Sequence, residues 1–198
     1  MIYYYPLFLI LLLLSLYEKN FNSRTIAIFS VLVFSILVLF AGFRSTEFGD
    51  YCSYVYVHLD SPNLLQYLPI IGEYRFHHEY IFSIIFIFFT KIFIDHPIFM
   101  FLSTAIVSIG IHFFCFKKMS PYFFLSVLIY FSHNYMFKEL AQIRAGVAGS
   151  FILLSLYFLA NNKNFKHLLL IGTGSLFHLS AIVTYIGYIF YKFNFKKI

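Results

Sequence analysis

The sequence predicts an all-α fold, a polytopic bundle of transmembrane helices, on three observations. Hydrophobic residues make up 61% of the chain, charged residues 11%, and the mean hydropathy is +0.83. With 29 Phe and 17 Tyr, the chain has too little polar surface to coat a soluble globule. The apolar runs are about 15–25 residues long, the length that a helix needs to cross a bilayer, and ten-residue alternating segments typical of a barrel are not seen. We therefore expect residues 1–198 to form a single integral membrane domain.

About seven apolar segments are predicted. They cover residues 2–17, 25–42, 80–94, 98–116, 121–137, 142–160 and 167–191. The first has no basic residue before it and no Ala-x-Ala-like site after it, which indicates a retained span and not a cleaved signal peptide.

The segment 80–94 is the weakest of the seven, because it is short and Lys91 interrupts it. If it fails to cross the membrane, the preceding loop and the Lys138–Arg144 region share one face. If it crosses fully, they lie on opposite faces. Charge counts do not settle the orientation.

One hydrophilic loop, about 43–79, separates the second apolar segment from the third. It carries five of the eight acidic residues of the chain, together with two arginines and three histidines. Ionisable groups near a membrane are costly to keep, so this cluster is the first place to look for chemistry. Its charged and histidine side chains are Glu47, Asp50, Asp60, Glu73, Glu79, Arg44, Arg75, His58, His77 and His78.

Other function classes find no support. The net charge of +6 comes largely from basic residues scattered in short connections, which suits anchoring at lipid head groups and does not suggest nucleic-acid binding. No P-loop, dinucleotide glycine motif, HExxH or GxSxG occurs. The two cysteines fit no paired metal motif, so we predict no metal site and no cofactor.

Arg44 and Asp50 are the first candidates for function. Arg44 follows the end of a predicted span, where a guanidinium can fork onto phosphate oxygens, and Asp50 can accept a proton or hydrogen-bond a sugar hydroxyl. The structural alternative is that Arg44 snorkels to the interface while Asp50 caps the next helical stretch.

A second candidate is Arg144, close to the start of the span 142–160, where a guanidinium has to find water, an acid or an anionic ligand. Snorkelling is the alternative here too. Ala141, Ala145 and Gly149 recur every four residues, a stripe that favours close helix packing over a pocket.

His178 is expected near the middle of the last span, where a histidine should face the bundle interior and can relay a proton. The alternative is a packing histidine bonded to Ser175 or Ser180. We expect His112, His133 and His167 at span ends, in interfacial positions.

Three blocks in order resemble the EpsG-like polysaccharide polymerases, which are related in role to the Wzy polymerases of O-antigen and capsule. The blocks are Phe43-Arg44 followed by Gly49-Asp50-Tyr51 and Tyr54, then Gln142-Ile143-Arg144 with Ala148, then Phe177-His178-Leu179-Ser180-Ala181. The family pattern has one residue between the Gly and the Asp, and a Gln where Ala145 stands. The likeness covers nearly all of the chain.

The resemblance implies a multi-pass protein of the bacterial inner membrane that acts in surface polysaccharide or lipopolysaccharide synthesis. Its activity would be glycosyl transfer from an undecaprenyl-diphosphate-linked glycan to a hydroxyl of another lipid-linked repeat unit. Catalytic roles would fall to Asp50, Arg144 and His178. Substrate would be bound by Arg44, Arg75, Tyr51, Tyr54 and Gln142.

Two alternatives remain open at this point. The first is a carrier of lipid-linked sugars, in which the same cations bind diphosphate but no bond breaks. The second is a non-catalytic remnant. Members of the family are as a rule longer than this chain, so a truncated product is an open expectation. Substrate and membrane lipid are the expected partners, and a chain-length regulator is a further partner that the sequence does not decide.

Overall fold

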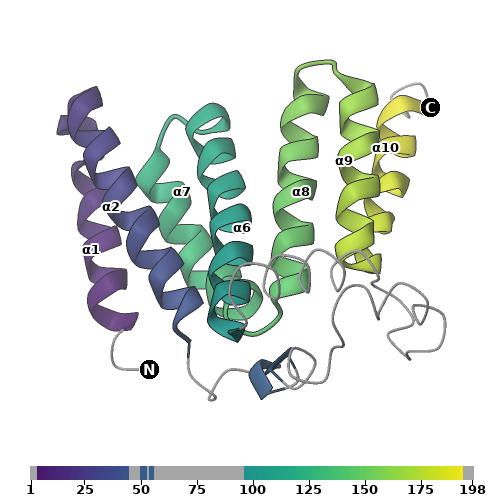
Figure 1. The fold of residues 1–198 in the computed structure, drawn as a ribbon. Coiled ribbons are helices and arrows are strands. Elements are labelled where there is room, and N and C mark those ends of the chain that lie inside the picture. Colours follow the sequence, from purple (N-terminus) through teal and green to yellow (C-terminus); the bar gives the residue numbers. More distant parts are fainter. Residues whose placement is uncertain (1–3, 45–49, 53, 56–95, 194–198) are drawn as a thin grey trace.

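The computed structural model describes residues 4–44, 50–52, 54–55 and 96–193, and these residues form helices joined by short connections (Figure 1). In chain order the elements are α1 (Tyr4–Tyr17), the 3₁₀ turn η1 (Glu18–Asn20), α2 (Ser23–Gly42), α6 (Pro97–Met119), α7 (Phe123–Tyr130), the π-helix η2 (Phe131–Glu139), α8 (Ile143–Ala160), α9 (Asn164–Phe177), the 3₁₀ turn η3 (Leu179–Val183) and α10 (Thr184–Phe193). The predicted all-α class is confirmed for this part of the chain.

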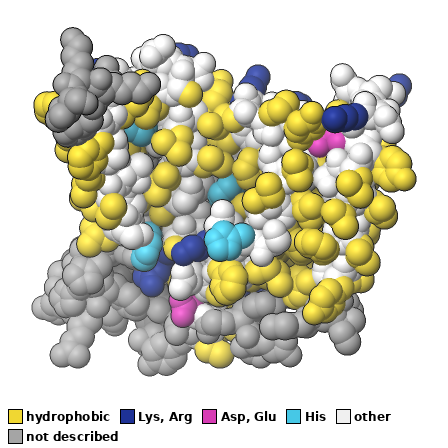
Figure 2. Space-filling model, turned by 180° about the vertical axis from the view of Figure 1, so that it is seen from behind, with side chains coloured by type: hydrophobic (Ala, Val, Ile, Leu, Met, Phe, Trp, Pro, Cys, Tyr) yellow, Lys and Arg dark blue, Asp and Glu magenta, His cyan; other side chains and the backbone are white. Residues whose placement is uncertain are grey.

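Three of the described helices, α2, α6 and α8, are long and apolar enough to cross a membrane by length and composition. Hydrophobic side chains cover much of the visible face in Figure 2, and many large ones are exposed, among them Leu9, Val31, Ile129 and Ile186. Such a surface would be unfavourable in water and is suited to hydrocarbon. The composition and the exposed surface of these helices therefore agree with the prediction of a membrane protein.

One half of the bundle is built from α1, α2, α6 and α7. Its core includes Leu11, Leu37, Ile109 and Phe124, which are fully buried. Pairs in contact are α1 with α7 and α2 with α6. These helices bury a continuous apolar seam between them.

Glu18 is buried because it caps α7. Its Oε1 accepts a hydrogen bond from the backbone N–H of Phe123 at 2.6 Å, and its Oε2 accepts one from Phe124 at 3.0 Å. The first amides of a helix lack intrahelical partners, and a negative charge there is stabilised by the helix dipole. The carboxylate thus joins the end of α1 to the start of α7.

The other half of the bundle corrects one prediction. We expected residues 167–191 to form one span, but α9 ends at Phe177 and His178 is extended, with φ −152° and ψ 119°. After the turn η3, α10 lies back along α9: Tyr185 Oη donates to Leu168 O at 2.8 Å. Two short apolar helices and one long helix have the same hydropathy profile, so the profile did not reveal the break.

His167 also differs from its expected interfacial position. It is fully buried, and its Nδ1 lies 3.0 Å from Ser155 O, an atom that can only accept a hydrogen bond. His112 is buried as well. Both lie inside the bundle because neighbouring helices cover them, which the distance from a span end did not indicate.

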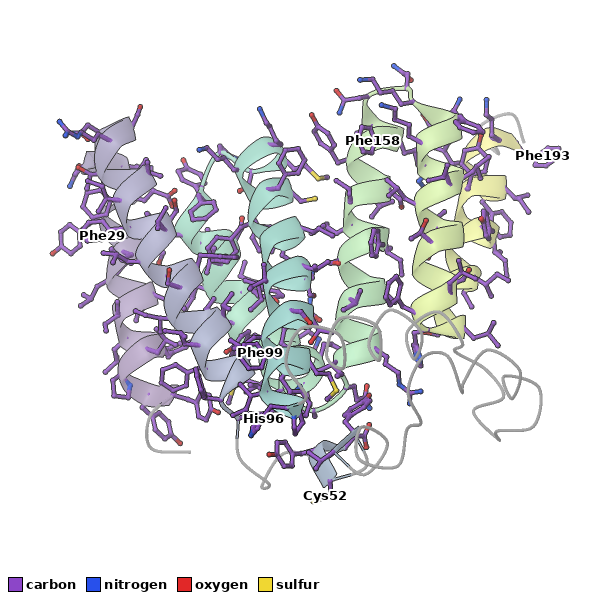
Figure 3. The ribbon with its side chains drawn as sticks, viewed as in Figure 1. Phe29, Cys52, His96, Phe99, Phe158 and Phe193 are labelled. Atoms are coloured by element: carbon purple, nitrogen blue, oxygen red, sulfur yellow. The ribbon has the colours of Figure 1, made fainter. Side chains whose placement is uncertain are left out.

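The two ends of the segment 45–95 lie at the same end of the bundle. A Cβ placed on Gly42, the last residue of α2, would lie 2.6 Å from Leu102 Cγ in the second turn of α6. Figure 3 shows Cys52 and His96 at this end, far from Phe158. The predicted segment 80–94 lies outside the described residues, so whether it crosses stays a prediction. Residues 56–95, Arg75 among them, lie outside the described residues.

Candidate functional site

Arg44 is held inside the bundle at the end where α2 and α9 end and α6 and α8 begin, which we call the Arg44 end. Its Nη1 donates to Glu139 O at 2.8 Å and to Leu140 O at 2.9 Å. Carbonyls at the C-terminus of a helix lack intrahelical donors, and a cation there is favourable. The guanidinium therefore caps η2 from the end of another helix.

The surroundings of Arg44 are aromatic and nearly closed. Its Cζ lies 3.9 Å from the centre of the Phe101 ring, and the residue is 7% exposed. Burial lowers the pKa of Arg44 to about 10, so the group remains protonated at neutral pH. Nε and Nη2 are buried and have no hydrogen-bond partner in the described part of the chain. The alternative in which Arg44 snorkels to the interface is therefore wrong.

The same Phe101 ring joins Arg44 to the two tyrosines of the predicted site. Tyr51 is stacked on it at 5.2 Å between ring centres, and Tyr54 meets it edge-on at 6.4 Å. Tyr54 is buried, and Arg144 Nε donates to its hydroxyl at 3.2 Å. Burial raises the pKa of Tyr54, while the charge of Arg144 opposes that change. Residues 90 positions apart in the chain are thus in direct contact.

Asp50 lies at the Arg44 end as well. It starts the short helical turn that contains both tyrosines, since its carbonyl accepts a hydrogen bond from Tyr54 N at 3.0 Å. The residue is exposed. Its carboxylate is therefore available at the surface, close enough to act electrostatically on Tyr54.

His178 lies at the Arg44 end and not near the middle of a span, as was expected. It is half-buried and follows the last residue of α9, Phe177, which packs against a small core of Tyr54, Phe101 and Ile143. Because α9 ends at Phe177, His178 lies at the turn into η3, where the chain reverses its direction.

Gln142 is exposed beside Arg144, and its Oε1 accepts a hydrogen bond from Lys138 Nζ at 3.2 Å. The described predicted residues are therefore gathered at one end of the bundle. Arg75 is the one predicted site residue that lies outside the described part.

Sequence reasoning missed Glu139. It is 3% exposed, and its Oε1 accepts hydrogen bonds from Ser108 Oγ at 2.7 Å and Tyr130 Oη at 2.8 Å. The wide turns of the π-helix bring residues nine positions apart to one side, which places Tyr130 against Glu139. The only sequence signal was an acidic residue just after a predicted span, next to Lys138, where an interfacial position is the ordinary interpretation.

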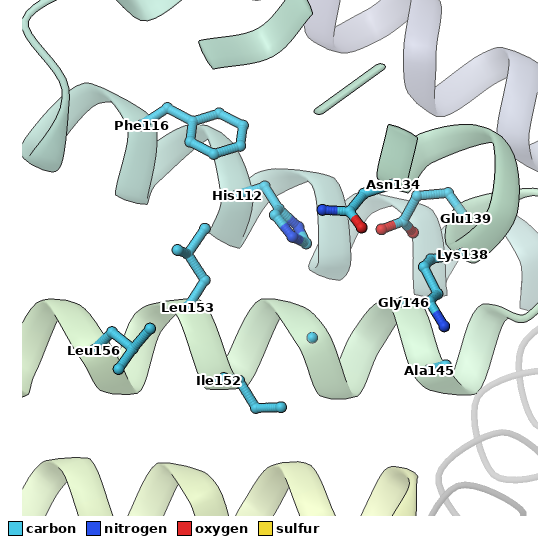
Figure 4. A pocket seen from close by; sticks show the side chains of 11 residues that line it. His112, Phe116, Asn134, Lys138, Glu139, Ala145, Gly146, Ile152, Leu153 and Leu156 are labelled. Carbon is cyan, nitrogen blue, oxygen red and sulfur yellow. The ribbon is translucent and has the colours of Figure 1, made fainter. Parts of the chain in front are cut away.

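Glu139 borders a cavity of about 310 Å³ between α6, η2 and α8 (Figure 4). A Cβ on Gly149 would meet no atom within 4 Å, whereas one on Gly146 would lie 3.1 Å from Glu139 Oε2. The small-residue stripe was predicted to pack closely against another helix, and that prediction is wrong at Ala145 and Gly149, which line the cavity. Spacing identifies small residues but not whether a neighbour fills the space beside them.

No group of three or more His, Cys, Asp or Glu side chains in the described ranges could hold a metal ion. The sequence model of the EpsG family matches residues 27–198. No curated protein and no solved structure gives a significant match to the chain.

Proposed function

This chain belongs to the EpsG family, membrane proteins of polysaccharide biosynthesis, and from that premise we propose that it is a polysaccharide polymerase. It joins undecaprenyl-diphosphate-linked oligosaccharide repeat units into surface polysaccharide such as O-antigen or capsule. Its place is the bacterial inner membrane, which it crosses several times. A chain-length regulator is a proposed partner in the same membrane.

One observation carries the proposal: two arginines from distant segments converge on one aromatic cluster at one end of the bundle. Arg144 is held by Tyr54, and Arg44 lies over Phe101, the ring that both Tyr51 and Tyr54 contact. A lipid diphosphate leaves with developing negative charge, which preorganised cations stabilise. An end of a membrane bundle is also where a lipid-linked head group would sit.

The two arginines take different roles in this proposal. Arg144, on the half-buried first turn of α8, binds the diphosphate. Arg44 has its Nη1 occupied by two carbonyls, so it acts chiefly as a positioning residue that fixes the segment leading to Arg144. Arg75 remains a further proposed cation, and Tyr51, Tyr54 and Gln142 remain proposed contacts to substrate.

In the reaction, the acceptor hydroxyl attacks the anomeric carbon of the donor glycan. The bond from that carbon to the diphosphate oxygen breaks, and the lipid diphosphate departs with the electron pair. The proton of the hydroxyl passes to Asp50 or His178, which lie at the same end of the bundle. A carboxylate or an imidazole suits this role, since either has a lone pair that can take up the proton as the hydroxyl attacks.

The test is chain length in a cell whose polymer depends on this protein. Arg144→Ala and Asp50→Ala should leave single-repeat glycolipid and abolish long chains. Loss of one preorganised donor costs about 10²–10³ in rate, and loss of a general base about 10²–10⁴. Lys163→Ala is the matched control, because Lys163 is an exposed cation at the opposite end of α8 and should leave chain length unchanged.

Normal chain length in both site variants would refute the proposed mechanism. The carrier alternative is separated by reconstitution with labelled lipid-linked donor. Movement of label between leaflets without new glycosidic bonds would indicate a transporter and not an enzyme.

A further inference from the structure

The cavity beside Glu139 is distinct from the cluster at the Arg44 end. Arg44 binds the backbone carbonyl of Glu139, whereas the Glu139 carboxylate lies against Ser108, Tyr130 and the cavity. None of the residues of the proposed polymerase site lines the cavity. Its walls are His112, Phe116, Asn134, Lys138, Glu139, Ala145, Gly146, Gly149, Ile152, Leu153 and Leu156.

Two buried side chains, Glu139 and His112, border the cavity, and each has one acceptor atom with no hydrogen-bond partner in the described part of the chain. Both hydrogen bonds to the Glu139 carboxylate go to Oε1, which leaves Oε2 unpaired within the described residues. His112, 6% exposed, has its Nδ1 2.9 Å from Ser108 O, so in the neutral ring Nδ1 is the donor and Nε2 an acceptor. Both residues line the cavity, so a ligand that offers a hydrogen-bond donor would be stabilised here.

The rest of the cavity is apolar and elongated. It follows one face of α8 from Ala145 to Leu156, a rise of about 16 Å at 1.5 Å per residue. Figure 4 shows His112, Asn134 and Glu139 together at one part of it, with Phe116 and Leu156 at the other. Leu156 is 40% exposed, so the apolar end of the cavity opens at the surface of the bundle. A single hydrocarbon chain fits this shape.

Charge selects the head group. Lys138 lines the same cavity and disfavours a cationic head, while the Glu139 carboxylate disfavours an anionic one. An uncharged hydroxyl avoids both repulsions, and its one proton can be donated to Glu139 Oε2. We propose that the cavity between α6, η2 and α8 binds an amphiphile whose hydroxyl head donates to Glu139 and whose single apolar chain lies along α8. This site does not depend on the proposed polymerase activity.

The test uses the full chain in phosphatidylcholine nanodiscs, because that lipid has no hydroxyl donor. The probe is a long-chain alcohol with a photoactivatable diazirine on its chain, and the labelled peptides are mapped by mass spectrometry. We expect labelling to concentrate on α6 and α8 around Phe116, Ile152 and Leu156. The matching methyl ether, which cannot donate, should label these positions about tenfold less, the loss expected for one hydrogen bond to a charged acceptor.

Gly149→Leu fills the cavity and should abolish the labelling, whereas Gly187→Leu, at a helical glycine that likewise has no atom within 4 Å of its Cβ position, should not. Competition by unlabelled polyprenol would identify an isoprenoid alcohol as the occupant. The proposal is overturned if polyprenol does not compete, if phosphatidylglycerol, which is anionic and has two chains, competes in its place, if the ether labels equally, or if Gly149→Leu leaves the labelling unchanged. The ether comparison stands even if Gly149→Leu fails to fold.

Discussion

Replacing Arg44 should destabilise the bundle as well as impair the protein's activity, because the side chain ties three helices together. It leaves the end of α2, caps the end of η2 and lies over Phe101 at the start of α6. Arg44→Ala removes the two hydrogen bonds to the carbonyls of Glu139 and Leu140 and the contact with the Phe101 ring. Arg44→Lys keeps the charge and can still donate to the two carbonyls, both of which bind Nη1, but it loses the planar guanidinium that lies over Phe101.

The magnitude follows from these contacts. A hydrogen bond that involves a charged group contributes about 1.5–3 kcal/mol, and a cation over an aromatic ring contributes about 0.5–2 kcal/mol. Part of this gain offsets the cost of burying the guanidinium, the same cost that lowers the pKa of Arg44. We expect a net loss of about 2–4 kcal/mol in the free energy of unfolding for Arg44→Ala. For Arg44→Lys we expect about half of that.

Thermal unfolding in detergent measures the effect. At roughly 2–4 °C per kcal/mol for a chain of this size, Tm should fall by about 5–15 °C in Arg44→Ala, with Arg44→Lys between it and wild type. Lys163→Ala, at an exposed position, should melt within about 2 °C of wild type. If Arg44→Ala melts like wild type yet makes no polymer, Arg44 binds substrate directly and its assignment as a positioning residue is refuted.

Three other predictions rest on single contacts. Glu18→Ala should lower the free energy of unfolding by about 2 kcal/mol, since two amides at the start of α7 lose their acceptor, and a denaturation midpoint equal to wild type would contradict that capping role. Gly42→Ala should lower the free energy of unfolding by about 1–3 kcal/mol, because its Cβ would overlap Leu102. Gly110→Ala should be neutral, since its Cβ would lie 3.8 Å from the nearest ring atom. Equal melting temperatures of the two variants would argue against close contact of α2 with α6. A membrane-impermeant maleimide should reach the exposed Cys52 from one side of the membrane and Lys163→Cys from the other, and labelling of both from the same side would be incompatible with the bundle described here.

Several features of the fold were available from the sequence because they depend on local composition. Apolar runs of spanning length predicted helices in a membrane, and α2 and α6 begin and end close to their expected boundaries of 25–42 and 98–116. The order of the three motif blocks indicated the family that now matches residues 27–198. These features can be identified without knowing which residues are in contact in the fold, since hydrophobicity and motif spacing are properties of consecutive residues.

The break at His178 and the buried Glu139 were not available in this way. A turn between two apolar helices leaves hydropathy unchanged, and whether a carboxylate next to Lys138 faces water or the bundle depends on Ser108 and Tyr130, which belong to other elements. The same holds for Gly149, whose open surroundings are set by the spacing of α6 from α8.

Composition, run length and motif order were enough to predict an all-α membrane protein, which holds for the described residues, and to select the ionisable residues that are candidates for chemistry. The folded arrangement was needed to show that Arg44, Tyr54 and Arg144 meet at one end of the bundle, that Arg44 binds helix carbonyls, and that Glu139 faces a cavity. Burial and hydrogen bonding depend on which distant segments the fold brings within about 3 Å of each other, and no property of consecutive residues specifies that.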